Sequence, residues 1–122
     1  MDRFVTYRRL VVYQHAKALA HDVYLIVNQF PDEEKFALSN QLRRAVCSIP
    51  SNIAEGMGRF SAKEQIHFIE IAYGSTNETL CQLELAESFG YISSEDFEKI
   101  EKQIIDLFKL LSGLRKSILN KQ

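Results

Sequence analysis

Hydrophobic residues recur along most of the chain at alternating steps of three and four, which is the spacing of one face of an α-helix. The pattern predicts four amphipathic helices and no strand. The first ends near Phe30, before Pro31, and the second runs from the acidic residues 32–34 to Gly56 and Gly58. The third lies between Ser61 and Gly90, and the fourth begins at Ser93 or Ser94. The predicted core positions are Val12, Ala16, Leu19, Val23, Ile26 and Phe30; Leu38, Leu42, Ala45, Ile49, Ile53 and Met57; Ile66, Ile69, Tyr73, Leu80 and Leu83; and Phe97, Ile100, Ile104, Leu107, Leu111, Leu114 and Ile118.

Residues that favour helix ends stand at the predicted boundaries. Asp32, Glu33 and Glu34 suit the positive end of a helix dipole, so they are expected to open the second helix. Ser61, followed three residues later by Glu64, has the spacing of a capping box. Because the connections between these helices are short, consecutive helices should pack antiparallel. The sequence therefore predicts an all-α, up-down-up-down four-helix bundle that forms one domain over residues 1–122.

A proline interrupts the second predicted helix. Pro50 removes one backbone hydrogen bond and its ring clashes with the preceding turn, at a cost of roughly 3 kcal/mol inside a helix. Ser48, Ser51 and Asn52 stand next to it and can bond the backbone groups that it leaves free. We therefore expect the second helix to be kinked at Pro50.

The third predicted helix carries more apolar residues than one face can hold. Besides its core positions, Phe68, Ile71 and Ala72 lie on other sides of the helix. Small soluble proteins rarely expose large contiguous apolar patches, so this surplus predicts a contact between subunits. The alternative is that a wide apolar stripe packs against two helices of its own bundle.

Composition places the chain among ordinary globular proteins. It has 122 residues, of which 46% are hydrophobic and 25% are charged, with two prolines and five glycines. No stretch approaches the length of apolar sequence that a membrane span needs, and no secretion signal is evident. Cys47 and Cys81 are far apart in sequence, as expected for free thiols in a reducing compartment. We therefore expect a cytoplasmic protein without a membrane partner.

The net charge of −1 conceals an uneven distribution. In an antiparallel bundle, basic residues gather at one end and acidic residues at the other. The candidate nucleic-acid-binding residues at the basic end are Arg3, Arg8, Arg9, Lys63, Arg115 and Lys116. An RNA or DNA backbone is the natural polyanionic ligand, and Tyr7, Tyr13 and Phe60 are available to stack on bases. The alternatives are that these charges only contact solvent, or that the acidic end docks against a neighbour's basic end.

Residues for catalysis are sparse. Glu64 and His67 form a single Glu-x-x-His unit, whereas di-iron bundles need two such units together with further carboxylates. His15 and His21 show no paired ligand spacing, and no Gly-rich phosphate loop or nucleophile elbow occurs. The sequence thus predicts a protein that is not an enzyme and that has no cofactor, metal or small-molecule substrate.

Several motifs together resemble a known family. They are Leu10-x-Val12-Tyr13-Gln14-x-Ala16, Phe30-Pro31, Glu34-x-Phe36-x-Leu38, Gln41-x-Arg43-Arg44-Ala45, Ser48-Ile49-Pro50-Ser51-Asn52-Ile53-Ala54-Glu55-Gly56, Arg59-x-Ser61-x-x-Glu64 and Gly74-Ser75-x-x-Glu78. The chain is similar in these motifs to the bacterial four-helix bundle proteins, also called the large-subunit (23S) ribosomal RNA intervening-sequence proteins. The resemblance implies a homopentamer without known enzymatic activity. A relative of similar fold, the accessory variability protein of diversity-generating retroelements, binds nucleic acid and a reverse transcriptase.

Residues of these motifs are the candidates for holding an oligomer interface or the kinked helix, with a ligand or nucleic-acid surface as the alternative. Ion pairs between Arg and Glu across a subunit boundary would set the orientation and register of the copies. The candidate interface or signature residues are Arg43, Arg44, Ser48, Pro50, Asn52, Glu55, Arg59, Tyr73 and Glu78. The first functional hypothesis is therefore a non-enzymatic oligomeric scaffold, with a pentamer favoured, and the second is an RNA- or DNA-binding accessory protein that uses the basic end.

Overall fold

The computed structural model describes residues 3–121, and within this range it contains helices and no strand. The long helices are α1 (Val11–Val27), α2 (Leu38–Met57), α3 (Ala62–Ser88) and α4 (Ser94–Asn120). Two short 3-10 segments, η1 (Arg3–Arg9) and η2 (Asp32–Glu34), precede α1 and α2. The predicted all-helical bundle is confirmed. The single domain over residues 1–122 stays a prediction, and residues 1, 2 and 122 lie outside the described range.

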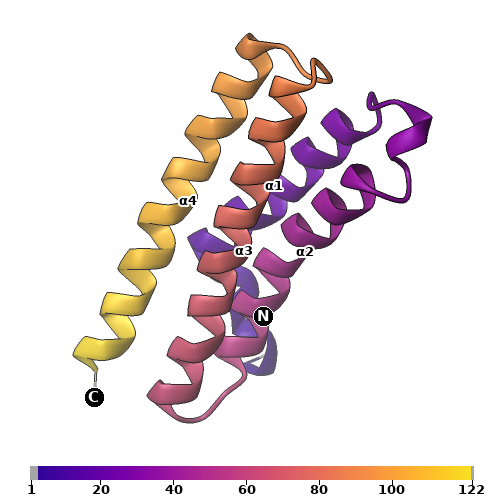
Figure 1. Cartoon of the computed structure of the whole chain (residues 1–122). Helices are drawn as coiled ribbons and strands as arrows, with labels where there is room; N and C mark the ends of the chain where they lie inside the picture. Colours follow the sequence, from indigo (N-terminus) through magenta and orange to yellow (C-terminus); the bar gives the residue numbers. More distant parts are fainter. Residues whose placement is uncertain (1–2, 122) are drawn as a thin grey trace.

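The four long helices lie side by side, and short connections join consecutive helices (Figure 1). Helix α1 packs against α2 and α4, while α3 packs against α2 and α4. Segment η1 folds back onto α1 and α2. The hydrophobic core fills the space enclosed by the four helices. Within residues 3–121, no helix is both long and apolar enough to cross a membrane.

Burial confirms most of the predicted core. Leu19, Leu42, Ile49, Leu107 and Leu111 are almost fully enclosed. At the margins, Ile26, Met57, Ile66, Leu80 and Leu114 are half-buried against this core. Tyr73 differs from the expectation, because it is 39% exposed.

The predicted helix ends are confirmed at three positions. The Ser61 hydroxyl accepts a hydrogen bond from the Glu64 amide at 3.1 Å, so Ser61 caps α3. Ser93 caps α4 by accepting from the Asp96 amide at 3.0 Å. Gly90 follows α3 with a φ of +80°, a conformation that glycine adopts without steric cost.

The predicted start of the second helix is wrong. Asp32, Glu33 and Glu34 form the separate turn η2, and α2 begins only at Leu38 because the backbone of Ala37 leaves the helical region (φ −120°, ψ −107°). Acidic residues at a helix start contribute only about 0.3–1 kcal/mol each. Burial of Phe30 and Leu38 on either side of this connection outweighs that preference. Similarly, Arg3, Arg8 and Arg9 lie on η1 and not at the start of the first α-helix.

The prediction that Gly56 and Gly58 end the second helix is confirmed for Gly58 and wrong for Gly56. Helix α2 continues through Gly56 to Met57, and Gly58 is the C-cap. Gly56 is buried where α2 meets α3: a Cβ atom there would lie 3.1 Å from the Phe68 Cβ atom and 3.2 Å from the Gln65 carbonyl oxygen. The absent side chain therefore allows the two helices to approach closely.

Helix α2 is continuous through Pro50. Two neighbouring side chains bond backbone carbonyls there, but neither bonds the Val46 carbonyl that Pro50 leaves free, so that part of the expectation is not confirmed. The Ser51 hydroxyl donates to the Cys47 carbonyl oxygen at 2.8 Å, and the Asn52 amide donates to the Ser48 carbonyl oxygen at 2.8 Å. Pro50 itself deprives the Val46 carbonyl of its usual donor.

Candidate functional site

The polar residues of the Ser48–Gly56 segment form a junction between α2 and α3. The hydroxyl oxygens of Ser48 and Ser75 lie 2.8 Å apart and share a part-buried hydrogen bond. The Asn52 side-chain amide donates to the Ser48 hydroxyl at 2.9 Å. The structure thus brings Ser48 and Asn52 together, and it places both of them in contacts within one chain. Ser75 is the third member of this junction.

Two other candidate interface residues pair with each other. Arg59 and Glu55 form an ion pair at 2.7 Å one turn apart at the end of α2. The Arg59 guanidinium also lies over the ring of Phe68 on α3, 4.6 Å from its centroid. Because both charged side chains are well exposed, such a pair contributes at most about 1 kcal/mol to stability. It helps to hold the close α2–α3 contact at Gly56.

The neighbouring arginines of α2 have different surroundings. Arg43 donates to the Asn28 side chain at 3.4 Å, and its guanidinium lies 5.7 Å from the ring centroid of Tyr24, so it contacts the α1 side. Tyr24 also bonds the Cys47 thiol at 3.4 Å, and this hydrogen bond, together with partial burial, raises the pKa of Tyr24. Arg44 is exposed and takes part in no hydrogen bond or ion pair within residues 3–121.

Glu78 belongs to a polar cluster on α3 that the sequence did not reveal. Its carboxylate accepts a hydrogen bond from the Gln82 amide nitrogen at 3.2 Å, and the same nitrogen donates to Gln41 of α2 at 3.3 Å. The side-chain oxygen of Gln82 is buried without a donor. An unpaired buried acceptor costs about 1–3 kcal/mol, so this cluster is short of hydrogen-bond donors.

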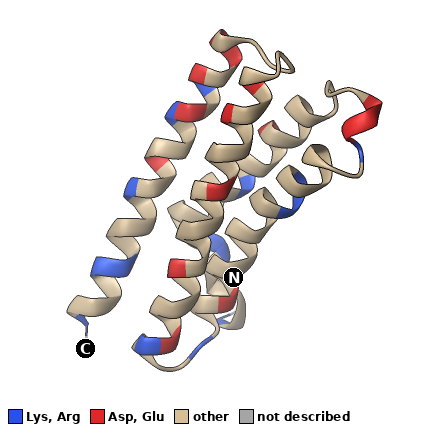
Figure 2. Cartoon of the chain, in the orientation of Figure 1, with Lys and Arg blue, Asp and Glu red and all other residues tan. Residues whose placement is uncertain are grey.

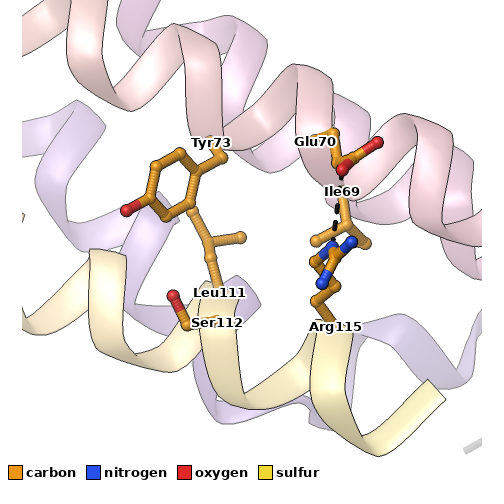
Figure 3. A pocket seen from close by; sticks show the side chains of 6 residues that line it. All are labelled: Ile69, Glu70, Tyr73, Leu111, Ser112 and Arg115. Atoms are coloured by element: carbon orange, nitrogen blue, oxygen red, sulfur yellow. Dashed lines mark ion pairs between the residues drawn. The ribbon is translucent and has the colours of Figure 1, made fainter. Parts of the chain in front are cut away.

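A groove of about 370 Å³ lies between α3 and α4 (Figure 3). Ile69 and Leu111 supply its apolar lining, and Arg115 pairs with Glu70 at 3.4 Å beside them. Tyr73 borders the groove, with its ring centroid 4.8 Å from that of Phe108. The volume of the groove is typical of small-ligand pockets. The two charged side chains that line it, Arg115 and Glu70, neutralise each other. Arg115, a candidate nucleic-acid-binding residue, is thus engaged within the chain.

The basic residues are placed near one end of the bundle, but acidic residues accompany them. Figure 2 shows basic residues at the C-terminal end of α4 and near the start of α3, whereas acidic residues dominate η2 and the start of α4. Arg8, Arg9, Lys63 and Lys116 are exposed. Glu64 shares this end with them.

A second cleft of about 370 Å³ lies at this end, between η1 and the end of α2. Arg3 and Arg59 line it together with aromatic side chains. Among these, Phe60 is fully exposed, whereas Tyr7 packs edge-on against Tyr13 with ring centroids 5.0 Å apart. The Arg8 guanidinium also lies over the Tyr7 ring, 5.9 Å from its centroid, so the predicted stacking surface is reduced mainly to Phe60. Within residues 3–121, no three His, Cys, Asp or Glu side chains gather as a metal site would require.

Fold and composition define a small all-helical bundle protein. The 23S rRNA-intervening sequence protein family matches residues 8–113, so the chain belongs to that family. A solved structure from Bacteroides thetaiotaomicron VPI-5482, a protein of unknown function from the S23 ribosomal protein family, is 31% identical in sequence with a TM-score of 0.80. That match covers 87% of this chain and 99% of the other. No curated protein matches the chain significantly.

Proposed function

We propose that the chain is a non-enzymatic cytoplasmic scaffold that assembles with copies of itself, with the homopentamer favoured. In this proposal each subunit is an up-down-up-down bundle whose second helix bends at Pro50. The observation that carries the proposal is the apolar surface that remains exposed after the bundle has formed. On α3 alone, Ile71, Tyr73 and Leu85 are each more than a third exposed, although α3 already packs against two helices. Burial of such surface is the usual driving force of assembly.

Native mass spectrometry over a wide range of protein concentration tests the scaffold. The expected result is one dominant assembly, five times the 14.1 kDa chain mass, that persists to low micromolar concentration. A single assembly with a different number of copies would contradict the pentamer but would still support an oligomeric scaffold. Monomer alone at every concentration contradicts the proposal.

The second candidate function is nucleic-acid binding at the basic end. The cleft that Arg3 lines beside Phe60 favours it, because a cation and an exposed ring together suit a phosphate backbone with unstacked bases, although Arg59 in the same cleft is paired with Glu55. The sequence pI of about 6.3 limits this function to a local patch. In an oligomer, the patches of several copies would act together on one strand.

Charge reversal tests this second function. Fluorescence anisotropy should detect structured RNA binding whose affinity falls steeply as salt rises, because bound phosphates release counterions. Replacing Arg8 and Arg9 by Glu should weaken binding at least about tenfold. The matched control replaces Lys99 and Lys102 of α4 by Glu, which gives the same net charge away from the basic end. Equal losses in both variants, or no binding at low salt, contradict the function.

A further inference from the structure

One face of α3 is exposed along the helix. Its residues follow each other at steps of four and three along the whole helix, and every one of them is exposed. We call this set the α3 stripe; it consists of His67, Ile71, Gly74, Glu78, Cys81 and Leu85. Ile71 and Leu85 are 38% and 43% exposed, and Glu78 is its single acid. A mostly apolar stripe with one charge is typical of a helix face that another helix covers.

Gly74 supports this interpretation. It lies in the interior of a long helix, where glycine costs about 1 kcal/mol relative to alanine. A Cβ atom at Gly74 would meet no atom of the chain within 4 Å, so the fold of one copy does not explain the glycine. Gly56 shows the contrast, because its missing side chain admits α3 of the same chain. If a helix of another molecule packed against α3 at this point, the missing side chain of Gly74 would allow the same close approach.

The polar cluster beside Gly74 lacks donors. Glu78 has no basic partner within residues 3–121, and it shares the single amide nitrogen of Gln82 with Gln41. A guanidinium group supplies up to five N–H donors and binds a carboxylate through two parallel bonds. The exposed Glu78 carboxylate therefore fits an arginine from outside the chain, whereas the Gln82 oxygen is buried out of its reach.

The chain itself carries an arginine of this kind. Arg44 is exposed on α2, the helix that packs against α3, and has no partner of its own within residues 3–121. We propose that α2 of a second copy covers the α3 stripe over Gly74, and that Arg44 of the second copy pairs with Glu78. When two different surfaces of the subunit contact each other, the same contact can repeat from copy to copy. The copies form a closed ring if the rotation between neighbouring subunits brings the last copy back to the first. This inference rests on the proposed self-assembly and identifies its contact surface.

Reversal of each charge tests the pair. Arg44→Glu and Glu78→Arg should each raise the dissociation constant of the assembly at least about tenfold, because like charges then face each other. An equimolar mixture of the two variants should assemble again, because every contact between unlike copies joins opposite charges and a five-membered ring need keep only one contact between like charges. Light scattering and native mass spectrometry measure both results. Circular dichroism confirms that each variant folds.

The mixture separates a pair between copies from a pair within one chain. If the single variants dissociate and the mixture does not assemble, the proposed pair is wrong. Variants that assemble like the wild type also overturn the contact surface, while the scaffold function stands. A monomeric wild type overturns the scaffold function itself.

Gly74 provides a second test that involves no charge. Gly74→Leu should dissociate the assembly while each chain stays folded, because the new side chain points into space that is open in one copy. Gly113→Leu is the matched control, since Gly113 is also an exposed helical glycine with nothing near its missing Cβ. Assembly that is insensitive to Gly74→Leu, or equally sensitive to both changes, contradicts the proposed surface.

Discussion

Replacing Gly56 by valine is expected to lower the free energy of unfolding by about 3 kcal/mol, the upper part of the range for overpacked sites. The first added atom would already lie 3.1 Å from the Phe68 Cβ atom and 3.2 Å from the Gln65 carbonyl oxygen. Both are close to or part of the backbone, so neither can rotate away as the end of a long side chain would. Valine adds two further methyl groups at this contact. Helices α2 and α3 must therefore separate, and the core that they share loosens.

Urea denaturation at a fixed protein concentration measures this change. Gly113→Val is the control, because the same residues are exchanged in a helix where the missing Cβ faces open space. We expect a change of less than about 0.5 kcal/mol there, as at most exposed sites. If Gly56→Val were as stable as this control, the close contact of α2 and α3 would not constrain the fold.

Replacing Pro50 by alanine is expected to raise the free energy of unfolding by about 2 kcal/mol. The change restores an amide donor for the Val46 carbonyl and removes the clash of the ring. In a helix, the missing hydrogen bond and the clash together cost about 3 kcal/mol. Alanine also gives the unfolded chain more freedom, which offsets about 1 kcal/mol of the gain. The helix is already continuous through Pro50, so it can accept the new hydrogen bond.

Thermal and urea unfolding of Pro50→Ala measure the result, with Ser51→Ala as a neighbouring control that removes only the bond to the Cys47 carbonyl. A variant less stable than the wild type would show that the proline shapes α2 to fit the core or a second copy. Native mass spectrometry of the same variant distinguishes these two roles. Loss of assembly with unchanged stability would assign Pro50 to the contact between copies.

The elements with strong local signals were predicted well from the sequence. Ser61 and Ser93 cap their helices as predicted, and Gly90 takes the positive φ that its position requires. These features depend on residues within one turn of each other, so no distant contact can easily change them. The acidic turn at Asp32 failed as a helix start because its preference is small beside the burial of Phe30.

The candidate site was predicted less completely. The sequence motifs indicated Ser48, Asn52 and Glu55, but not the side-chain partners that these residues have in the structure. Nothing in the sequence pointed to Gln82, whose unpaired oxygen is visible only once α2 and α3 are placed together. The sequence does not show whether a polar side chain bonds water or a buried neighbour. Hydrogen bonds across helices cannot be inferred from spacing along one of them.

The sequence by itself determined the helices, most of their ends and the apolar faces that form the core, because these follow from periodicity and local chemistry. Only the tertiary structure decided which apolar residues stay uncovered. The angle and distance at which α2 crosses α3 bury Gly56 and leave Gly74 in the open. Two glycines with the same local preference thus acquire different roles, since packing geometry depends on every residue along both helices.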